Sequence, residues 1–62
     1  MNTEAKFTDD EKAAEAEREL RMRKQVYPRR VADGRMTQAD ADRKIAIMAE
    51  IAEDYKSKGR LL

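Results

Sequence analysis

Arginine is the residue type whose spacing in this sequence best suits chemistry with a partner. Residues 18–35 hold seven basic and two acidic side chains, although the net charge of the whole chain is only +1. A basic stripe on one face of a helix suits contacts with phosphates or with an acidic protein surface. The candidate residues for binding a protein or a nucleic acid are Arg18, Arg21, Arg29, Arg30 and Arg35.

The same charges also have a purely structural interpretation. Glu17 precedes Arg21 by four residues and Glu19 precedes Arg23 by four, an order in which acid–base pairs support a helix. Alternating charge along a helix is typical of a solvated face. The sequence leaves both interpretations open, a binding face and a solvated face.

The sequence predicts no catalytic or metal site. It has no cysteine and no histidine, which removes the usual zinc and transition-metal ligands. Ser57 is the single serine and has no histidine to activate it, and there is no glycine-rich phosphate loop. The acidic cluster of Glu50, Glu53 and Asp54 is interpreted as a solvated helix face rather than an acid/base pair. We therefore expect a protein that is not an enzyme and takes no cofactor, metal or small molecule.

A first helix is predicted over about 9–33. Thr8 and Glu11 have the spacing of a capping box, which starts a helix. Pro28 cannot donate a hydrogen bond to the carbonyl of Lys24, so the helix either kinks there and continues or ends there and leaves 28–36 as a loop. The apolar spacing of Tyr27 and Val31 across the proline favours the kink. The apolar positions that recur at helical spacing are Ala13, Ala16, Leu20, Tyr27 and Val31.

A second helix is predicted over about 38–57. Thr37 and Asp40 repeat the start signal, and Gly34 suits a left-handed C-cap that ends the first helix. Gly59 is interpreted as a residue beyond the end of the second helix. Its apolar seam has alternating spacings of four and three residues: Ala41, Ile45, Met48, Ala52 and Tyr55.

Because few residues separate the two predicted helices, they must lie antiparallel, and the fold class is an all-α helical hairpin. We expect a flexible N-terminal tail over 1–7, one hairpin domain over 8–58 and a C-terminal tail over 59–62. No apolar run approaches the roughly 20 residues that cross a bilayer, and no signal peptide is recognisable. A cytoplasmic protein of a bacterial cell is expected.

Blocks of charge along the chain favour one register of this hairpin. Folding back sets the acidic residues 9–17 against the basic residues 56–60, and the basic residues 18–35 against the acidic residues 40–54. Arg23 is expected to reach across the seam toward acids of the second helix. Exposed ion pairs contribute only about 0–1 kcal/mol each, so their effect is on register more than on stability.

The apolar surface of the second helix is wider than one partner helix can cover. Ile47 and Ile51 widen its seam into a broad arc. A 62-residue chain buries only about 60 % of its unfolded surface, so a core built from two helices is marginal. We expect a homodimer that forms a four-helix bundle, or a groove on another protein. The face to be covered comprises Leu20, Tyr27, Val31, Ile45, Ile47, Met48, Ile51 and Tyr55.

A set of short motifs lies within residues 20–55: Tyr27-Pro28, Val31, the turn Gly34-Arg35-Met36-Thr37, and an Ile/Met-rich helix that ends in Asp54-Tyr55. With these motifs the segment resembles small uncharacterised helical proteins of bacteriophages and of prophage regions in proteobacteria. This resemblance implies a protein that binds and redirects or blocks a host or phage machine, such as a defence complex. It carries no catalytic motif.

Three functions follow as alternatives. The first is a non-enzymatic interaction protein that binds a protein partner and modulates or blocks a nucleic-acid machine, with its acidic blocks as partial phosphate mimics. The second is a small accessory protein that binds nucleic acid through the arginine-rich end of the hairpin. The third is a purely structural helical dimer.

Overall fold

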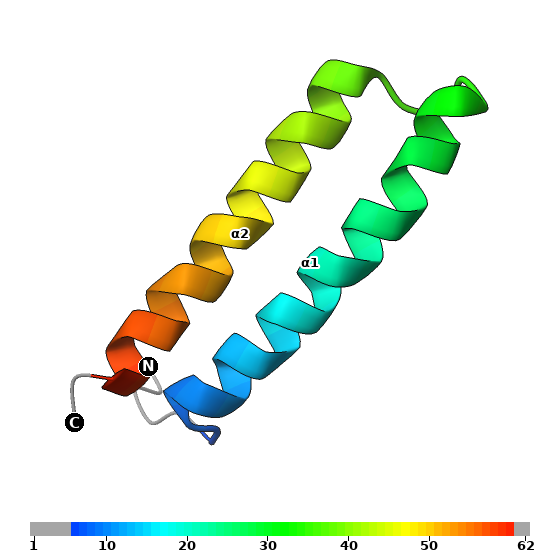
Figure 1. The fold of residues 1–62 in the computed structure, drawn as a ribbon. Coiled ribbons are helices and arrows are strands. Elements are labelled where there is room, and N and C mark those ends of the chain that lie inside the picture. Colours follow the sequence, from blue (N-terminus) through cyan, green and yellow to red (C-terminus); the bar gives the residue numbers. More distant parts are fainter. Residues whose placement is uncertain (1–5, 61–62) are drawn as a thin grey trace.

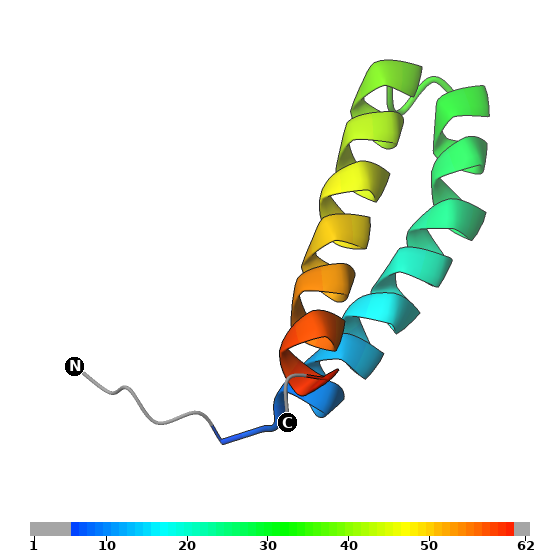
Figure 2. The same cartoon turned by 60° about the vertical axis from the view of Figure 1, so that its left-hand side comes forward.

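The computed structural model describes residues 6–60 of the chain, and over this range it has two helices and no strand. Helix α1 spans Asp9–Ala32 and helix α2 spans Gln38–Arg60. Figures 1 and 2 show them side by side from two directions, antiparallel and joined by one short connection. The predicted all-α hairpin is confirmed. Of the predicted N-terminal tail, residues 1–5 lie outside the described range, as do residues 61–62 of the C-terminal tail.

The start of α1 is fixed by the predicted capping box. The Thr8 hydroxyl accepts from the backbone N–H of Glu11 at 3.0 Å, and the Glu11 carboxylate accepts from the backbone N–H of Thr8 at 2.9 Å. Two N–H groups that the helix leaves without carbonyl partners are thereby satisfied. Asp9 and Asp10 add negative charge where the helix dipole is positive.

The chain reverses around Gly34, whose φ of 76° is left-handed as predicted. The N–H of Gly34 donates to the carbonyl of Val31 at 3.1 Å, and that of Arg35 donates to the carbonyl of Arg30 at 2.8 Å. This pair of bonds is the Schellman motif, which ends a helix with a left-handed residue, at a position where glycine is preferred. Immediately after it, the Thr37 hydroxyl accepts from the N–H of Asp40 at 3.1 Å and starts α2.

Pro28 lies inside α1, which continues beyond it to Ala32. The prediction that the helix passes through this proline is therefore confirmed. Tyr27 is buried immediately before it, and Val31 is half-buried one turn later, so the apolar side of the helix is kept across the proline.

The core between the helices is built mainly from alanine. The buried residues in the described range are Ala13, Ala16, Tyr27, Ala41, Met48 and Ala52. Met48 forms one cluster with Ala16 and Ala52, and Leu20 packs against it while remaining half-buried. Small side chains allow two helices to approach closely, but they bury little apolar area. The hairpin therefore has a thin core.

Helix α2 continues past the predicted end at Ser57 to Arg60, so Gly59 and Arg60 belong to the helix and not to a tail. The end of α2 lies beside the first turn of α1. A Cβ atom added at Gly59 would meet the carboxylate of Asp10, an exposed side chain that would have to move, whereas the backbone of α1 stays at ordinary contact distance. Gly59 therefore lies within α2 and does not end it.

The predicted charge pairing is confirmed at one end of the hairpin. The Lys56 ammonium lies 2.6 Å from the Glu17 carboxylate, which joins the basic end of α2 to the acidic start of α1. The other predicted pairing, of basic residues 18–35 with acidic residues 40–54, is not made by any ion pair in residues 6–60. Arg23 crosses to α2, but it donates to the backbone carbonyl of Lys44 at 2.9 Å and pairs with Glu19 of its own helix at 3.0 Å. The acceptor for Arg23 on α2 is therefore a backbone carbonyl and not the expected carboxylate.

Candidate binding surface on the first helix

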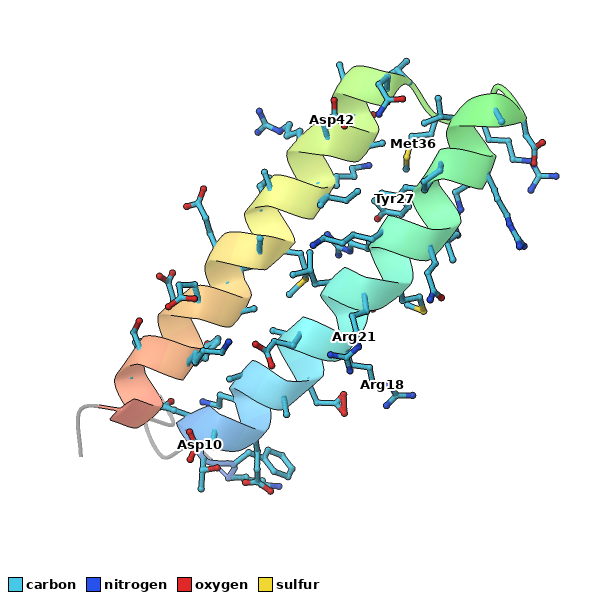
Figure 3. All side chains as sticks on the ribbon, viewed as in Figure 1. Asp10, Arg18, Arg21, Tyr27, Met36 and Asp42 are labelled. Atoms are coloured by element: carbon cyan, nitrogen blue, oxygen red, sulfur yellow. The ribbon has the colours of Figure 1, made fainter. Side chains whose placement is uncertain are left out.

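The outward face of α1 carries three of the five predicted arginines. Arg18, Arg21 and Arg29 are exposed, and helical spacing places them on the side of α1 away from the buried seam. Met22 and Gln25 are exposed between them. Figure 3 shows Arg18 extending away from α2, whereas Tyr27 lies between the two helices. We call Arg18, Arg21, Met22, Gln25 and Arg29 the arginine strip.

The arginines differ in how far other side chains engage them. Arg18 lies 3.6 Å from Glu15, and both side chains are mostly exposed, which makes this a weak contact. The expected pair of Glu17 with Arg21 is absent from the described structure, because Glu17 pairs with Lys56 instead. Arg21 and Arg29 make no ion pair within residues 6–60, so their guanidinium groups face solvent.

The remaining two predicted arginines lie apart from the strip. The Arg30 guanidinium lies 5.6 Å from the centre of the Tyr27 ring, and the Arg23 guanidinium lies 5.9 Å from it. Both contacts lie within α1, and a cation over an aromatic face is attracted to the ring. Arg35 is exposed in the connection between the helices. The structure therefore brings together Arg18, Arg21 and Arg29, and places Arg30 and Arg35 elsewhere.

The predicted site did not include Met22, which is the apolar residue of the arginine strip. Its side chain is 51 % exposed, and it borders two surface hollows of α1, one with Arg18 and the other with Val26. An exposed methionine surrounded by arginines has the composition of a protein interface, in which both residue types are enriched. The available sequence signal was the departure of Met22 from the apolar seam.

The predicted apolar face is divided by the structure into a covered and an uncovered part. Tyr27 and Met48 are buried, and Leu20, Val31, Ile45 and Tyr55 are half-buried. Ile47 and Ile51 remain 43 % and 38 % exposed. These two isoleucines are the residues that widen the seam beyond what α1 can cover.

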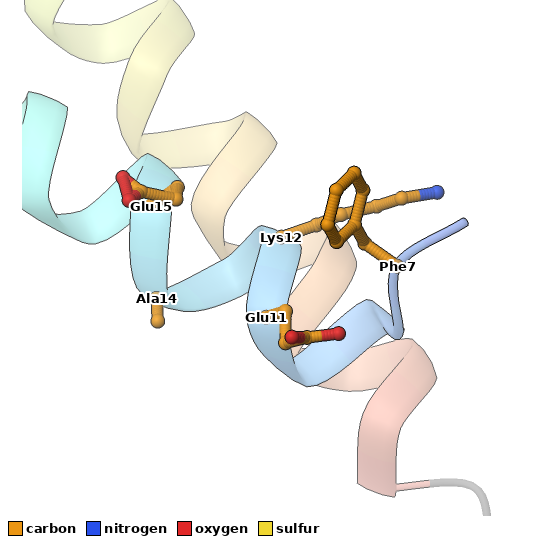
Figure 4. Close-up of a pocket in the computed structure, with 5 residues that line it drawn as sticks. All are labelled: Phe7, Glu11, Lys12, Ala14 and Glu15. Atoms are coloured by element: carbon orange, nitrogen blue, oxygen red, sulfur yellow. The ribbon is translucent and has the colours of Figure 1, made fainter. Parts of the chain in front are cut away.

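A further hollow lies at the start of α1, where Phe7 is 62 % exposed. Figure 4 shows the Phe7 ring beside the side chain of Lys12, with Glu11, Ala14 and Glu15 completing the lining. Phe7 directly precedes the N-cap Thr8, at a position where apolar residues commonly pack against the helix that follows. Its position next to the cap explains its contact with the helix, and nothing in the lining suggests a reactive group.

Two other kinds of site were sought in the described residues. Residues 6–60 contain no group of three or more acidic side chains arranged to hold a metal ion. Neither helix, as far as the structure describes them, is both long and apolar enough to cross a membrane. Comparison of the chain with protein-family models, with curated proteins and with solved structures gives no match.

Proposed function

We propose that this protein is a non-enzymatic interaction protein and that the arginine strip binds an acidic surface of a protein partner. The observation that carries this proposal is the 51 % exposed Met22 among exposed arginines. Side chains at positions i, i+4, i+7 and i+11 of a helix form one ridge, and Arg18, Met22, Gln25 and Arg29 have this spacing. Recognition of a helix by a groove uses such a ridge, with an apolar anchor and flanking charges.

Binding of nucleic acid is the second candidate, favoured by the five basic residues and the absence of any acid between Glu19 and Asp33. Three observations favour the protein partner. The net charge of the chain is only +1, and the acidic Glu15 lies beside Arg18. The apolar side chain of Met22 has no group that could bind a phosphate. Binding to a phosphate backbone depends on many cationic contacts and little apolar surface.

The resemblance to phage and prophage proteins suggests the class of partner. A host or phage machine that handles nucleic acid, such as a defence complex, presents both acidic and basic surfaces. Under this proposal the hairpin inhibits by occupying such a surface. Under the same proposal, further helices cover Ile47 and Ile51, which the hairpin alone leaves exposed, and complete a four-helix bundle. These helices come from a second copy or from the partner.

The test compares captured proteins among matched variants. Bait protein immobilised at fixed density is exposed to bacterial lysate, with Met22→Ala and the double variant Arg18→Glu/Arg29→Glu as strip variants. Arg43→Glu is the control, since Arg43 is exposed on α2 outside the strip. We expect a protein that is retained by the wild type and the control, and lost from both strip variants. Truncation of an anchor residue typically weakens binding by about tenfold or more.

A second measurement separates the two candidate partners. Fluorescence anisotropy with random duplex DNA is recorded at about 50 mM and 200 mM salt, because phosphate binding weakens steeply over this range. No binding at tens of micromolar supports the protein partner. Tight, steeply salt-dependent binding that the strip variants abolish would overturn it in favour of nucleic acid.

A further inference from the structure

Helix α2 carries a second stripe beside its buried seam, and all six of its residues are exposed. Ile47 and Ile51 lie at the centre of this stripe. An acidic and then a basic residue precede them along the chain, and an acidic and then a basic residue follow them. The spacing alternates between four and three residues, as in a coiled-coil seam. In chain order the stripe comprises Asp40, Lys44, Ile47, Ile51, Asp54 and Lys58.

The contacts of the hairpin show on which flank this stripe lies. Arg23 crosses from α1 to the carbonyl of Lys44, and the Lys58 ammonium lies 5.0 Å from the centre of the Tyr55 ring. The salt bridge between Glu17 and Lys56 lies on the opposite flank, because Lys56 is turned by about 140° from Ile51 around the helix axis. The stripe is therefore continuous along one flank, clear of the salt bridge and of the arginine strip.

The stripe is complementary to a second copy of itself that runs in the opposite direction. A twofold axis crossing α2 at the level of Ala49 places Ile47 against Ile51 of a second copy. The same axis places Lys44 against Asp54 and Asp40 against Lys58, so every charged residue faces its opposite. In a parallel arrangement each charged residue would face the same residue of the second copy, and all four contacts would be repulsive.

We propose that the isoleucine stripe is the interface of a homodimer in which two α2 helices lie antiparallel about this axis. This inference rests on the part of the proposed function that has Ile47 and Ile51 covered by further helices, and it names the second copy as their source. A twofold interface must be complementary to itself, and this stripe meets that condition in both its apolar and its charged positions. The thin, alanine-rich core leaves the isoleucines as the largest apolar surface of α2 still to be buried.

Sedimentation equilibrium of the full chain, from about 10 to 500 μM, gives the first test. The wild type is expected at twice the chain mass of 7.2 kDa. Lys44→Glu and Asp54→Lys are each expected to raise the dimer dissociation constant, on the order of tenfold or more, since each converts two symmetry-related attractions into repulsions. Lys24→Glu on α1 and Glu53→Lys on α2 carry the same changes of charge at exposed positions on the flank away from the stripe, and should leave the constant unchanged.

Mixing the two variants decides the arrangement. In a complex of the Lys44→Glu chain with the Asp54→Lys chain, the two substituted residues face each other with opposite charges, and the second contact is the unchanged pair of Lys44 and Asp54. The equimolar mixture should therefore dimerise like the wild type. Within one helix, positions 44 and 54 are about 15 Å apart and cannot compensate each other. Far-UV circular dichroism checks that each variant is helical.

A wild type that sediments as a monomer at 500 μM would overturn the homodimer. A dimeric wild type whose variants fail to combine would overturn the antiparallel register. Neither result bears on the arginine strip, which is tested by capture. Because Lys44→Glu lies outside that strip, this variant should still retain the captured protein, and the two proposals therefore fail separately.

Discussion

Met48 and Met22 allow the same substitution to be made in the core and on the proposed binding surface. Met48 is 9 % exposed and packs with Ala16, Ala52 and Leu20. Truncating a buried methionine to alanine costs about 2–5 kcal/mol. Alanine neighbours cannot extend into the space that is left, but a core of two helices is open at its flanks and can partly collapse. We therefore expect a loss of about 2–3 kcal/mol for Met48→Ala.

This loss is large for so small a protein. A domain of 62 residues is expected to have a free energy of unfolding of about 3–9 kcal/mol. Thermal unfolding followed by far-UV circular dichroism should show the Tm of Met48→Ala lowered by roughly 10–20 °C. All variants are compared at one protein concentration, because association would stabilise the folded state by mass action.

Met22→Ala is the matched control, since the side chain is already 51 % exposed. It should change the free energy of unfolding by no more than about 0.5 kcal/mol while removing the capture of the partner. If Met22→Ala destabilised the protein as much as Met48→Ala, the strip would be part of the fold and not a binding surface. If Met48→Ala had no effect, the described core would be wrong.

Two further predictions concern the turn and the salt bridge. Gly34→Ala should lower the free energy of unfolding by about 1 kcal/mol, because an added Cβ meets no atom within 4 Å and only the left-handed backbone is strained. Gly34→Asn should lower it less, since asparagine tolerates this backbone better, and the midpoints of urea unfolding would show the difference. A double-mutant cycle with Lys56→Met and Glu17→Gln should give a coupling free energy of about 0.5 kcal/mol, since both side chains are more than a third exposed. Salt at about 1 M should screen this coupling. A coupling that persists in salt would contradict this.

Local signals in the sequence were sufficient to predict the hairpin. Thr8, Gly34 and Thr37 act through backbone groups within a few residues of themselves, so their roles can be inferred without knowing the fold. The choices between competing partners could not be inferred in this way. Glu17 had Arg21 on its own helix and Lys56 on the other, and only the distance between the helices decides in favour of Lys56.

The same limit applies to residues whose role depends on how closely the helices approach. Gly59 suggested a helix end, but α2 continues through it beside the first turn of α1. Arg23 was expected to reach an acidic side chain of the second helix, but it donates to the backbone carbonyl of Lys44. Met22 was visible as a departure from the seam, yet its exposure depends on which face of α1 the second helix occupies.

The alanine-rich seam accounts for both the close hairpin and its uncovered surface. Helices approach most closely where the contact positions are small, and four of the six buried residues are alanines. The larger apolar side chains that such a contact cannot hold are placed beside it, where Ile47 and Ile51 lie. A hairpin that buried its isoleucines internally would need a wider spacing of the helices and would have no stripe to offer a second copy. The small core is thus the structural reason why Ile47 and Ile51 stay exposed on α2, and this exposed surface is the one that the proposed homodimer would bury.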